Sequence, residues 1–329
     1  MPDQTTLSAL GPLAGLYVDP AITEIIVDAP NRVLVEHSGR LEETSVAFAS
    51  ESAQREVMKA LLALSGPPLA AGQTIADVRL ADGSRVLAIF PPTATNGPCL
   101  VIRKWFTSAL TWDKLVEWEF VTPEAVDVLK GAFQAHVNLL VTGGTASGKT
   151  TFANLLTELI PAHEHVVVVE EIKKLQVHHA RSVWLEAATA TPLPMDELLS
   201  IASKLYADWL IVGELTGPAA ACALEIFGHG HAGFTTLHAT GVEDALSRLE
   251  VMCLKANLGL GLSEIRAMIA SAFRLVTFQE RPENGARRLT QIVELRGAEN
   301  DRYVLCPLFR HSPISRKLEP TGDRPRWRS

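Results

Sequence analysis

The chain has 329 residues, of which 47% are hydrophobic and 20% are charged, and its formal net charge is −7. This length allows two domains, each with its own core, and the composition is ordinary for a folded soluble protein. The acidic balance argues against non-specific binding to nucleic acid, which normally requires a basic protein.

The expected location follows from features that the sequence lacks. No apolar run approaches the ~20 residues of a membrane-spanning helix, and the N-terminus has no signal-peptide profile. The four cysteines lie far apart without CxxC spacing, which is typical of reduced thiols and not of a disulfide framework or a zinc site. We therefore expect a cytoplasmic protein.

Residues 1–106 predict a small α+β domain behind a flexible or helical lead-in. Leucine and valine at helical spacing predict a helix over 51–64, which Gly66 and Pro67–Pro68 close. Asp82–Gly83 is a strong hairpin signal, and Ser38–Gly39 predicts a further turn. The predicted strands are 22–27, 32–36, 40–42, 77–80, 84–90 and 99–104.

Residues 107–121 are interpreted as a linker, followed by a second domain over 122–311. A helix begins at Thr122 with a cap, a first-turn proline and an early acid, and it runs to about residue 135. Residues 312–329, rich in proline and arginine, predict a disordered tail.

The second domain contains a strand, a glycine-rich loop and a helix that Pro161 ends. The loop reads GGTASGKT and fits the pattern GxxxxGK[ST] of a phosphate-binding loop. Its backbone N–H groups can converge on an anion, Lys149 can reach the β and γ phosphates, and the Thr150 hydroxyl can ligate Mg²⁺. The expected nucleotide-binding residues are Gly143, Gly144, Thr145, Ala146, Ser147, Gly148, Lys149, Thr150 and Thr151.

Beyond the loop, strand-like and helix-like segments alternate, which predicts a parallel sheet with helices on both faces. Residues 165–169 and 208–212 predict strands that end in Glu170–Glu171 and in Gly213–Glu214, with a helix over 195–206 between them. Ligands of such sheets bind at the carboxyl ends of the strands. Glu214 is therefore interpreted as the acid that positions an attacking water near Mg²⁺.

A histidine-rich segment follows, with GHGHAG and then TTLHA. A metal site at His229 and His231 is disfavoured, because no cysteine or acid at ligand spacing completes it. We interpret the segment as a glycine-loosened turn that aims a histidine and hydroxyl groups at a phosphate.

The segments GGTASGKTT, LIVGE and GHGHAGFTTLHA, in this order and spacing, resemble the traffic ATPases of type II and type IV secretion. The nearest branches are those of conjugative transfer and tight-adherence pilus assembly. ITEIIVDAPNRVLVEHSGRLEE, LADGSRVLAIFPP and LVIRKW resemble the family's N-terminal domain, so the resemblance extends over residues 16–300. It implies a RecA-like P-loop ATPase domain with a smaller α+β N-terminal domain.

The resemblance also implies the activity, the cofactors and the partners. It predicts a hexameric ATPase that uses ATP and Mg²⁺ to power secretion, conjugation or pilus assembly through motion between its domains. The expected partners are inner-membrane components of such a machine, through which the protein contacts the cytoplasmic face of the membrane, and no direct contact with nucleic acid is expected. The implied catalytic residues are Glu214, Glu171, His238, Arg103 and Arg85.

The chain also departs from the family pattern. Lys174 stands where the family has a carboxylate after the second strand, and a lysine there could favour bound ATP while removing help for the attacking water. Two alternatives therefore stay open, a weakly or non-hydrolysing ATP-binding regulatory subunit and a RecA-like nucleic-acid motor. The other departures are Lys204, Tyr206 and Thr216 at usual arginine positions and Ala146 at a usual glycine.

Overall fold

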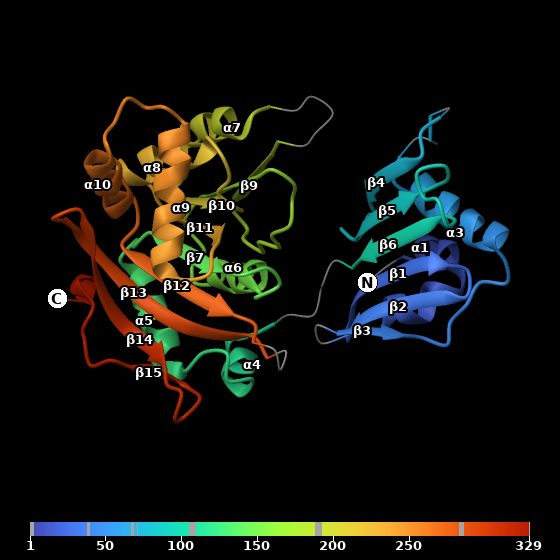
Figure 1. The fold of residues 1–329 in the computed structure, drawn as a ribbon, viewed down its shortest axis with the longest axis horizontal. Helices are drawn as coiled ribbons and strands as arrows, with labels where there is room; N and C mark the ends of the chain where they lie inside the picture. The colour runs from blue at the N-terminus through green and yellow to red at the C-terminus, as the bar shows by residue number, and fades with distance from the viewer. Residues whose placement is uncertain are drawn as a thin grey trace. The chain divides into compact units, whose positions relative to one another are not determined.

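The computed structural model describes residues 3–37, 40–66, 69–70, 72–104, 110–187, 193–282 and 286–328. The chain divides into two compact units, Met1–Ala109 and Leu110–Ser329 (Figure 1). The turn predicted at Ser38–Gly39, the helix stop at Pro67–Pro68 and the domain boundary at residue 106 lie outside the described residues.

The first unit is a six-stranded antiparallel sheet with helices packed on it, in the order β3-β2-β1-β6-β5-β4. Its strands are β1 Ile22–Ala29, β2 Arg32–His37, β3 Arg40–Glu43, β4 Ile75–Arg79, β5 Arg85–Ile89 and β6 Cys99–Arg103. Its helices are α1 Gln4–Ala9, the 3₁₀ turn η1 Gly11–Leu13, α2 Ala14–Val18 and α3 Glu51–Ala63. The lead-in is therefore helical, and the α+β interpretation is confirmed.

The hairpin predicted at Asp82–Gly83 connects β4 to β5. The N–H of Gly83 donates to the carbonyl of Leu80, and the backbone of Gly83 has a φ of 91°. The core of the unit combines alternate residues of the strands, such as Ile25 and Val27, with the inner faces of α1 and α3.

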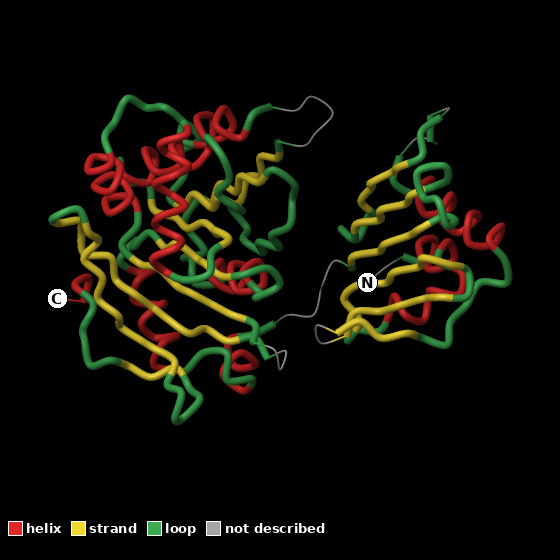
Figure 2. Tube along the Cα trace, viewed as in Figure 1, coloured by secondary structure: helices red, strands yellow, loops and turns green. Residues whose placement is uncertain are grey.

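The second unit is built on a nine-stranded sheet in the order β15-β14-β13-β12-β7-β11-β10-β8-β9 (Figure 2). The strands from β12 to β9 in this order are parallel, and β13, β14 and β15 extend the sheet antiparallel. Their bounds are β7 Leu139–Gly143, β8 Val166–Glu170, β9 Ser182–Glu186, β10 Trp209–Val212, β11 Ala232–His238, β12 Leu275–Glu280, β13 Arg288–Glu299, β14 Arg302–His311 and β15 Leu318–Pro320.

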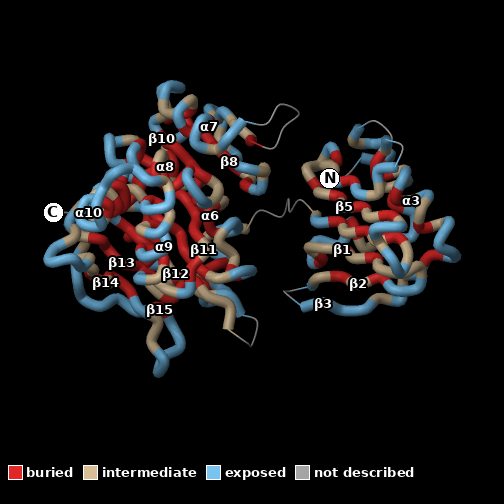
Figure 3. The backbone as a smooth tube through the Cα atoms, turned by 45° about the horizontal axis from the view of Figure 1, so that its top comes forward, coloured by how far each residue is buried: buried red, intermediate tan, exposed pale blue. Residues whose placement is uncertain are grey.

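Helices cover both faces of this sheet, as the alternation of its buried side chains requires (Figure 3). Val141 and Val168 belong to a core that includes α5 and α6, whereas Leu140 and Val167 belong to a core with α7, α8, α9 and α10. The helices are α4 Trp112–Glu117, α5 Pro123–Gln134, α6 Lys149–Thr157, α7 Met195–Ala202, α8 Ala219–Gly228, α9 Val242–Lys255, α10 Leu262–Ala272 and the 3₁₀ turn η2 Arg326–Arg328.

Three predicted boundaries differ from the structure. Residues 110–121 of the expected linker belong to the second unit, because Leu115 and Phe120 are buried in its core; residues 107–109 lie outside the described residues. The expected disordered tail is ordered through residue 328, since Leu318 is buried in β15 and Trp327 packs on the same core. The helix predicted to reach residue 206 ends at Ala202.

Within the described part of the chain, no helix combines the length and the apolar character needed to cross a membrane. The four cysteines are free thiols, and among the described residues no His, Cys, Asp and Glu side chains form a group of three or more that could hold a metal ion.

Candidate functional site

The segment 143–150, here called the phosphate loop, joins β7 to α6 through backbone conformations that glycine favours. Gly143, Ala146 and Gly148 have φ values of 158°, 57° and 95°. A Cβ on Gly143 would lie 2.4 Å from the backbone oxygen of Gln279, so only glycine fits there. Residues in such conformations turn neighbouring N–H groups to one side, an arrangement that binds anions at a helix N-terminus.

Lys149, the first residue of α6, is half-buried and folds back onto the loop. Its ammonium donates hydrogen bonds of 2.8 Å to the carbonyls of Gly143 and of Gly144. Burial lowers the pKa of Lys149, the charge of Glu214 opposes that shift, and Lys174 adds to it. The lysine is therefore held at the loop by weak acceptors that a phosphate group can replace.

The carboxyl ends of five neighbouring parallel strands meet at the edge where this loop lies. The register pairs Gly143 with His238 on one side and with Gln279 on the other. On the far side of β11, β10 pairs with β8, so the residues that follow these two strands also lie at this edge. The polar residues at or just after these ends are Gln279, His238, Glu214 and Glu170.

His238 is the last residue of β11, and its Nε2 lies 2.8 Å from the hydroxyl oxygen of Thr145. The structure thus brings the predicted histidine into direct contact with the phosphate loop. His229 and His231 precede β11 and lie at its amino end, so of the histidine-rich segment His238 is the histidine that lies at the loop. The expected contact of this segment with a phosphate stays a prediction.

Glu214 follows β10 and pairs with Lys174, whose Nζ lies 3.7 Å from its Oε2. Both side chains are about half-exposed. The turn that carries Glu214 is fixed from β11, since the hydroxyl of Thr236 donates to the carbonyl of Gly213 at 2.6 Å and Leu215 N–H donates to Thr236. The predicted acid therefore has a positive charge beside it, at a position where the resemblance implied a carboxylate.

The acid that the strand places at the sheet edge is Glu170 and not Glu171. Glu170 is 3% exposed, and its carboxylate accepts hydrogen bonds from the N–H groups of Lys174 and Leu175 at 3.0 and 3.1 Å. Burial raises the pKa of Glu170, although these two N–H groups and Lys174 oppose the shift. Glu171 is exposed and makes no hydrogen bond or ion pair with another described residue, so its expected role stays a prediction.

Residues 171–175, here called the β8 loop, are held by further contacts. Lys173 donates its backbone N–H to Glu186 at 2.9 Å, and its ammonium lies 4.0 Å from the centre of the Trp184 ring. A Cβ on Gly213 would lie 2.7 Å from Glu170, so the neighbouring strand end packs closely on this acid. The position of Lys174 is thus defined by an anchored loop.

Two residues that sequence reasoning missed contact the phosphate loop, one from β12 and one from the position just before β13. Gln279 is fully buried and donates to the carbonyl of Ser147 at 3.2 Å, and Arg287 donates to the carbonyl of Ala146 at 3.1 Å. The hydroxyl of Ser147 and the Oε1 of Gln279 are buried without a hydrogen-bond partner in the described structure. Unsatisfied polar atoms beside a loop of this kind fit a site that binds a phosphate with its cation.

Arg85 and Arg103 belong to the first unit and lie opposite each other in the register of β5 and β6. Arg85 forms an ion pair with Asp77, with its Nε 2.7 Å from Oδ1, and this hydrogen bond raises the pKa of Arg85. Arg103 lies 3.4 Å from Glu24. The structure therefore brings these two arginines together, and their expected contact with a nucleotide remains a prediction.

The parallel sheet, the phosphate loop and the polar strand ends define a RecA-like P-loop nucleotide-binding protein with a smaller α+β domain before it. The chain belongs to the family described as type II/IV secretion system protein, whose model matches residues 7–291.

Its relatives include proteins named for conjugal transfer. A putative conjugal transfer protein of Mycobacterium tuberculosis is 29% identical over 308 residues, covering 90% of this chain and 87% of the relative. The conjugal transfer protein TrbB of Rhizobium radiobacter is 27% identical over 289 residues, covering 87% of each. The structure of the pilus retraction motor PilT with bound ADP matches with a TM-score of 0.64 at 18% identity, covering 92% of this chain and 83% of that one, which shows a shared fold.

Proposed function

We propose that the protein is a Mg²⁺-dependent ATPase that powers secretion, conjugation or pilus assembly. The observation that carries this proposal is the meeting of the phosphate loop, His238 and the Glu214–Lys174 pair at one sheet edge. Membership of the secretion family supplies the class of machine. The same proposal includes a hexamer that works at the cytoplasmic face of the membrane on inner-membrane partners, by ATP-driven motion between the two domains.

Each residue receives a role from its place in the site. The N–H groups of the phosphate loop and the ammonium of Lys149 would bind the phosphates, and the hydroxyl of Thr150, exposed at the start of α6, would ligate Mg²⁺. Bound Mg²⁺ would neutralise charge on the phosphate oxygens and act as a Lewis acid. Glu214 would orient the attacking water, and His238, through Thr145, would sense or hold the loop.

The ion pair of Lys174 with Glu214 favours a second candidate, in which the protein binds ATP and hydrolyses it slowly or not at all. A carboxylate that already accepts an ammonium is a weaker base for water, because the positive charge stabilises its ionised form. The β8 loop holds Lys174 in this position through its own backbone contacts. Such a protein would act as an ATP-binding regulatory subunit of the same kind of machine.

Two measurements on purified full-length protein test these candidates. Steady-state phosphate release with Mg²⁺ and ATP distinguishes them, since turnover of roughly one per second or faster supports the motor and tight binding without turnover supports the regulatory subunit. A protein that neither binds nor hydrolyses ATP would contradict both candidates. Mass photometry with ATP and Mg²⁺ tests the hexamer, and a strict monomer at micromolar concentration would count against it.

A further inference from the structure

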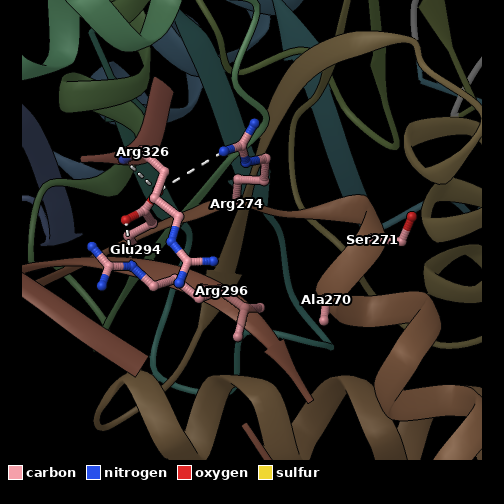
Figure 4. A pocket seen from close by; sticks show the side chains of 7 residues that line it. Ala270, Ser271, Arg274, Glu294, Arg296 and Arg326 are labelled. Carbon is pink, nitrogen blue, oxygen red and sulfur yellow. Dashed lines mark hydrogen bonds and ion pairs between the residues drawn. The ribbon is translucent and has the colours of Figure 1, made fainter. Parts of the chain in front are cut away.

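A polar cavity lies near the amino-terminal ends of the parallel strands of this sheet, at the end opposite the phosphate loop (Figure 4). Its volume is about 200 Å³, and its lining comes from the end of α10, from β13 and from the C-terminal segment. Arg274 of this lining immediately precedes β12, whose Gln279 pairs with Gly143 of the phosphate loop. Five residues at about 3.3 Å each place these two ends about 17 Å apart. The cavity is therefore distinct from the proposed nucleotide site.

The lining is dominated by positive charge. Figure 4 shows the side chains of Arg274, Arg296 and Arg326 gathered around Glu294, which is 1% exposed. Three guanidinium groups and one carboxylate leave a formal excess of two positive charges. Asp323, which acts electrostatically on Arg296 from outside the lining, reduces this excess to one.

The Glu294 carboxylate is already satisfied on both oxygens. Its Oε2 accepts a hydrogen bond of 2.8 Å from Arg296, and its Oε1 accepts one of 3.0 Å from the backbone N–H of Arg326. Arg274 comes no closer to this carboxylate than 3.9 Å, and its side chain is 48% exposed. The glutamate therefore fastens the C-terminal segment to β13, and Arg296 also donates to the carbonyl of Arg324 at 3.0 Å. The Arg274 guanidinium has no hydrogen bond to any residue that the structure describes.

We propose that this cavity, the arginine pocket, binds a phosphate group through Arg274, with the positive charge of Arg296 beside it. Guanidinium groups bind phosphate oxygens through paired N–H···O hydrogen bonds, and a phosphate offsets the excess positive charge. The volume is several times the ~30 Å³ of a water molecule, so it admits a phosphate with part of its hydration shell. The source is a soluble phosphate or the headgroup of an anionic phospholipid, which present the same oxygens.

The test uses the full-length protein with its phosphate loop filled by Mg²⁺ and a non-hydrolysable ATP analogue. Inorganic phosphate is titrated calorimetrically against a chloride reference of equal ionic strength. We expect one phosphate per chain outside the nucleotide site, and Arg274→Gln should weaken its binding about tenfold because one charged donor group is lost. Arg310→Gln, which removes an exposed arginine of β14 outside the pocket, is the matched control and should leave binding unchanged.

Arg274→Gln keeps both short hydrogen bonds of Glu294, so its unfolding temperature should match that of the control. The titration is repeated without nucleotide on Lys149→Ala, which disables phosphate binding at the phosphate loop by a second route. The arginine pocket of this variant should still bind inorganic phosphate.

A second arm measures co-sedimentation with phosphatidylcholine vesicles with and without phosphatidylglycerol. Arg274-dependent binding to the anionic vesicles assigns the pocket to a headgroup, and dependence in the calorimetric arm alone assigns it to a soluble phosphate. The proposal would be overturned if Arg274→Gln and Arg310→Gln weakened phosphate binding equally, or if neither arm showed binding that depends on Arg274.

Discussion

Two loops at the carboxyl edge of the sheet differ in how closely they keep the pattern of the family. The phosphate loop keeps every residue that the motif requires, and its one altered position, Ala146, still has the backbone conformation of a glycine. In the β8 loop, Lys174 stands where the resemblance to the family implies a carboxylate, and it pairs with Glu214. In the proposed function, binding of the nucleotide and handling of its terminal phosphate would therefore rest on separate loops, of which one could change while the other is kept.

The largest effect is expected in the loop that binds. Lys149→Ala should weaken ATP binding at least 100-fold, or about 2.7 kcal/mol, because the variant loses the ammonium that would leave the carbonyls of Gly143 and Gly144 for the phosphates. Fluorescent-nucleotide titration measures this effect. Lys130→Ala, at an exposed position of α5, is the matched control. A folded Lys149→Ala protein with unchanged affinity would remove the basis of the proposed function.

Glu214→Gln should separate hydrolysis from binding. The amide keeps the size of the side chain but cannot accept a proton, so kcat should fall about 100-fold. The ATP dissociation constant should change by less than about threefold, because the phosphate loop is untouched. Single-turnover hydrolysis with a parallel binding measurement decides the outcome. A large loss of affinity together with kcat would mean that Glu214 holds the nucleotide instead.

Lys174→Glu tests whether the β8 loop restrains turnover. We expect that Lys174, which pairs with Glu214, would stabilise the ground state with bound phosphates and would give the transition state no equal benefit. We expect kcat to rise ten- to a hundredfold, about 1.4–2.7 kcal/mol of barrier. Lys174→Gln should give an intermediate kcat, and the control variant Lys130→Glu should leave kcat unchanged. Brisk turnover by the wild type that Lys174→Glu slows would make Lys174 a working part of a motor.

These two loops also show how far the sequence predicts the site. The strand, loop and helix around Lys149 could be predicted because the motif demands those elements within a few residues of each other. Glu214 followed from the rule that ligands bind at strand ends, and His238 followed from the resemblance to the family. The sequence placed both Glu170 and Glu171 at a strand end and assigned the catalytic role to Glu171. In the structure Glu170 alternates with Val166 and Val168 and is buried on their face of the sheet.

Contacts between segments that are distant in the chain could not be predicted from local sequence patterns. Gln279 reaches the phosphate loop only because β12 pairs with β7, two strands that are more than a hundred residues apart in the chain. Arg287 follows from the same pairing through β13. The C-terminal segment has the composition of a disordered tail, yet the buried Leu318 and the bond from Arg326 to Glu294 order it. The order of this segment depends on its packing against the sheet, which the composition of the segment does not reveal.

The smallest expected effect concerns Ala146, the one altered residue of the phosphate loop. Its φ of 57° is left-handed, which costs about 1–2 kcal/mol for an L-residue, while glycine loses about 0.5–1 kcal/mol of extra entropy on folding. Ala146→Gly should therefore stabilise the protein by about 0.5 kcal/mol and raise the melting temperature by about 1–2 °C. Ala256→Gly, at a right-handed position with a φ of −70° after α9, should destabilise it by a similar amount. Differential scanning calorimetry measures both. If Ala146→Gly destabilises the protein as much as Ala256→Gly, then the methyl group of Ala146 stabilises the loop. The left-handed backbone of Ala146 would then not be strained as its φ angle indicates.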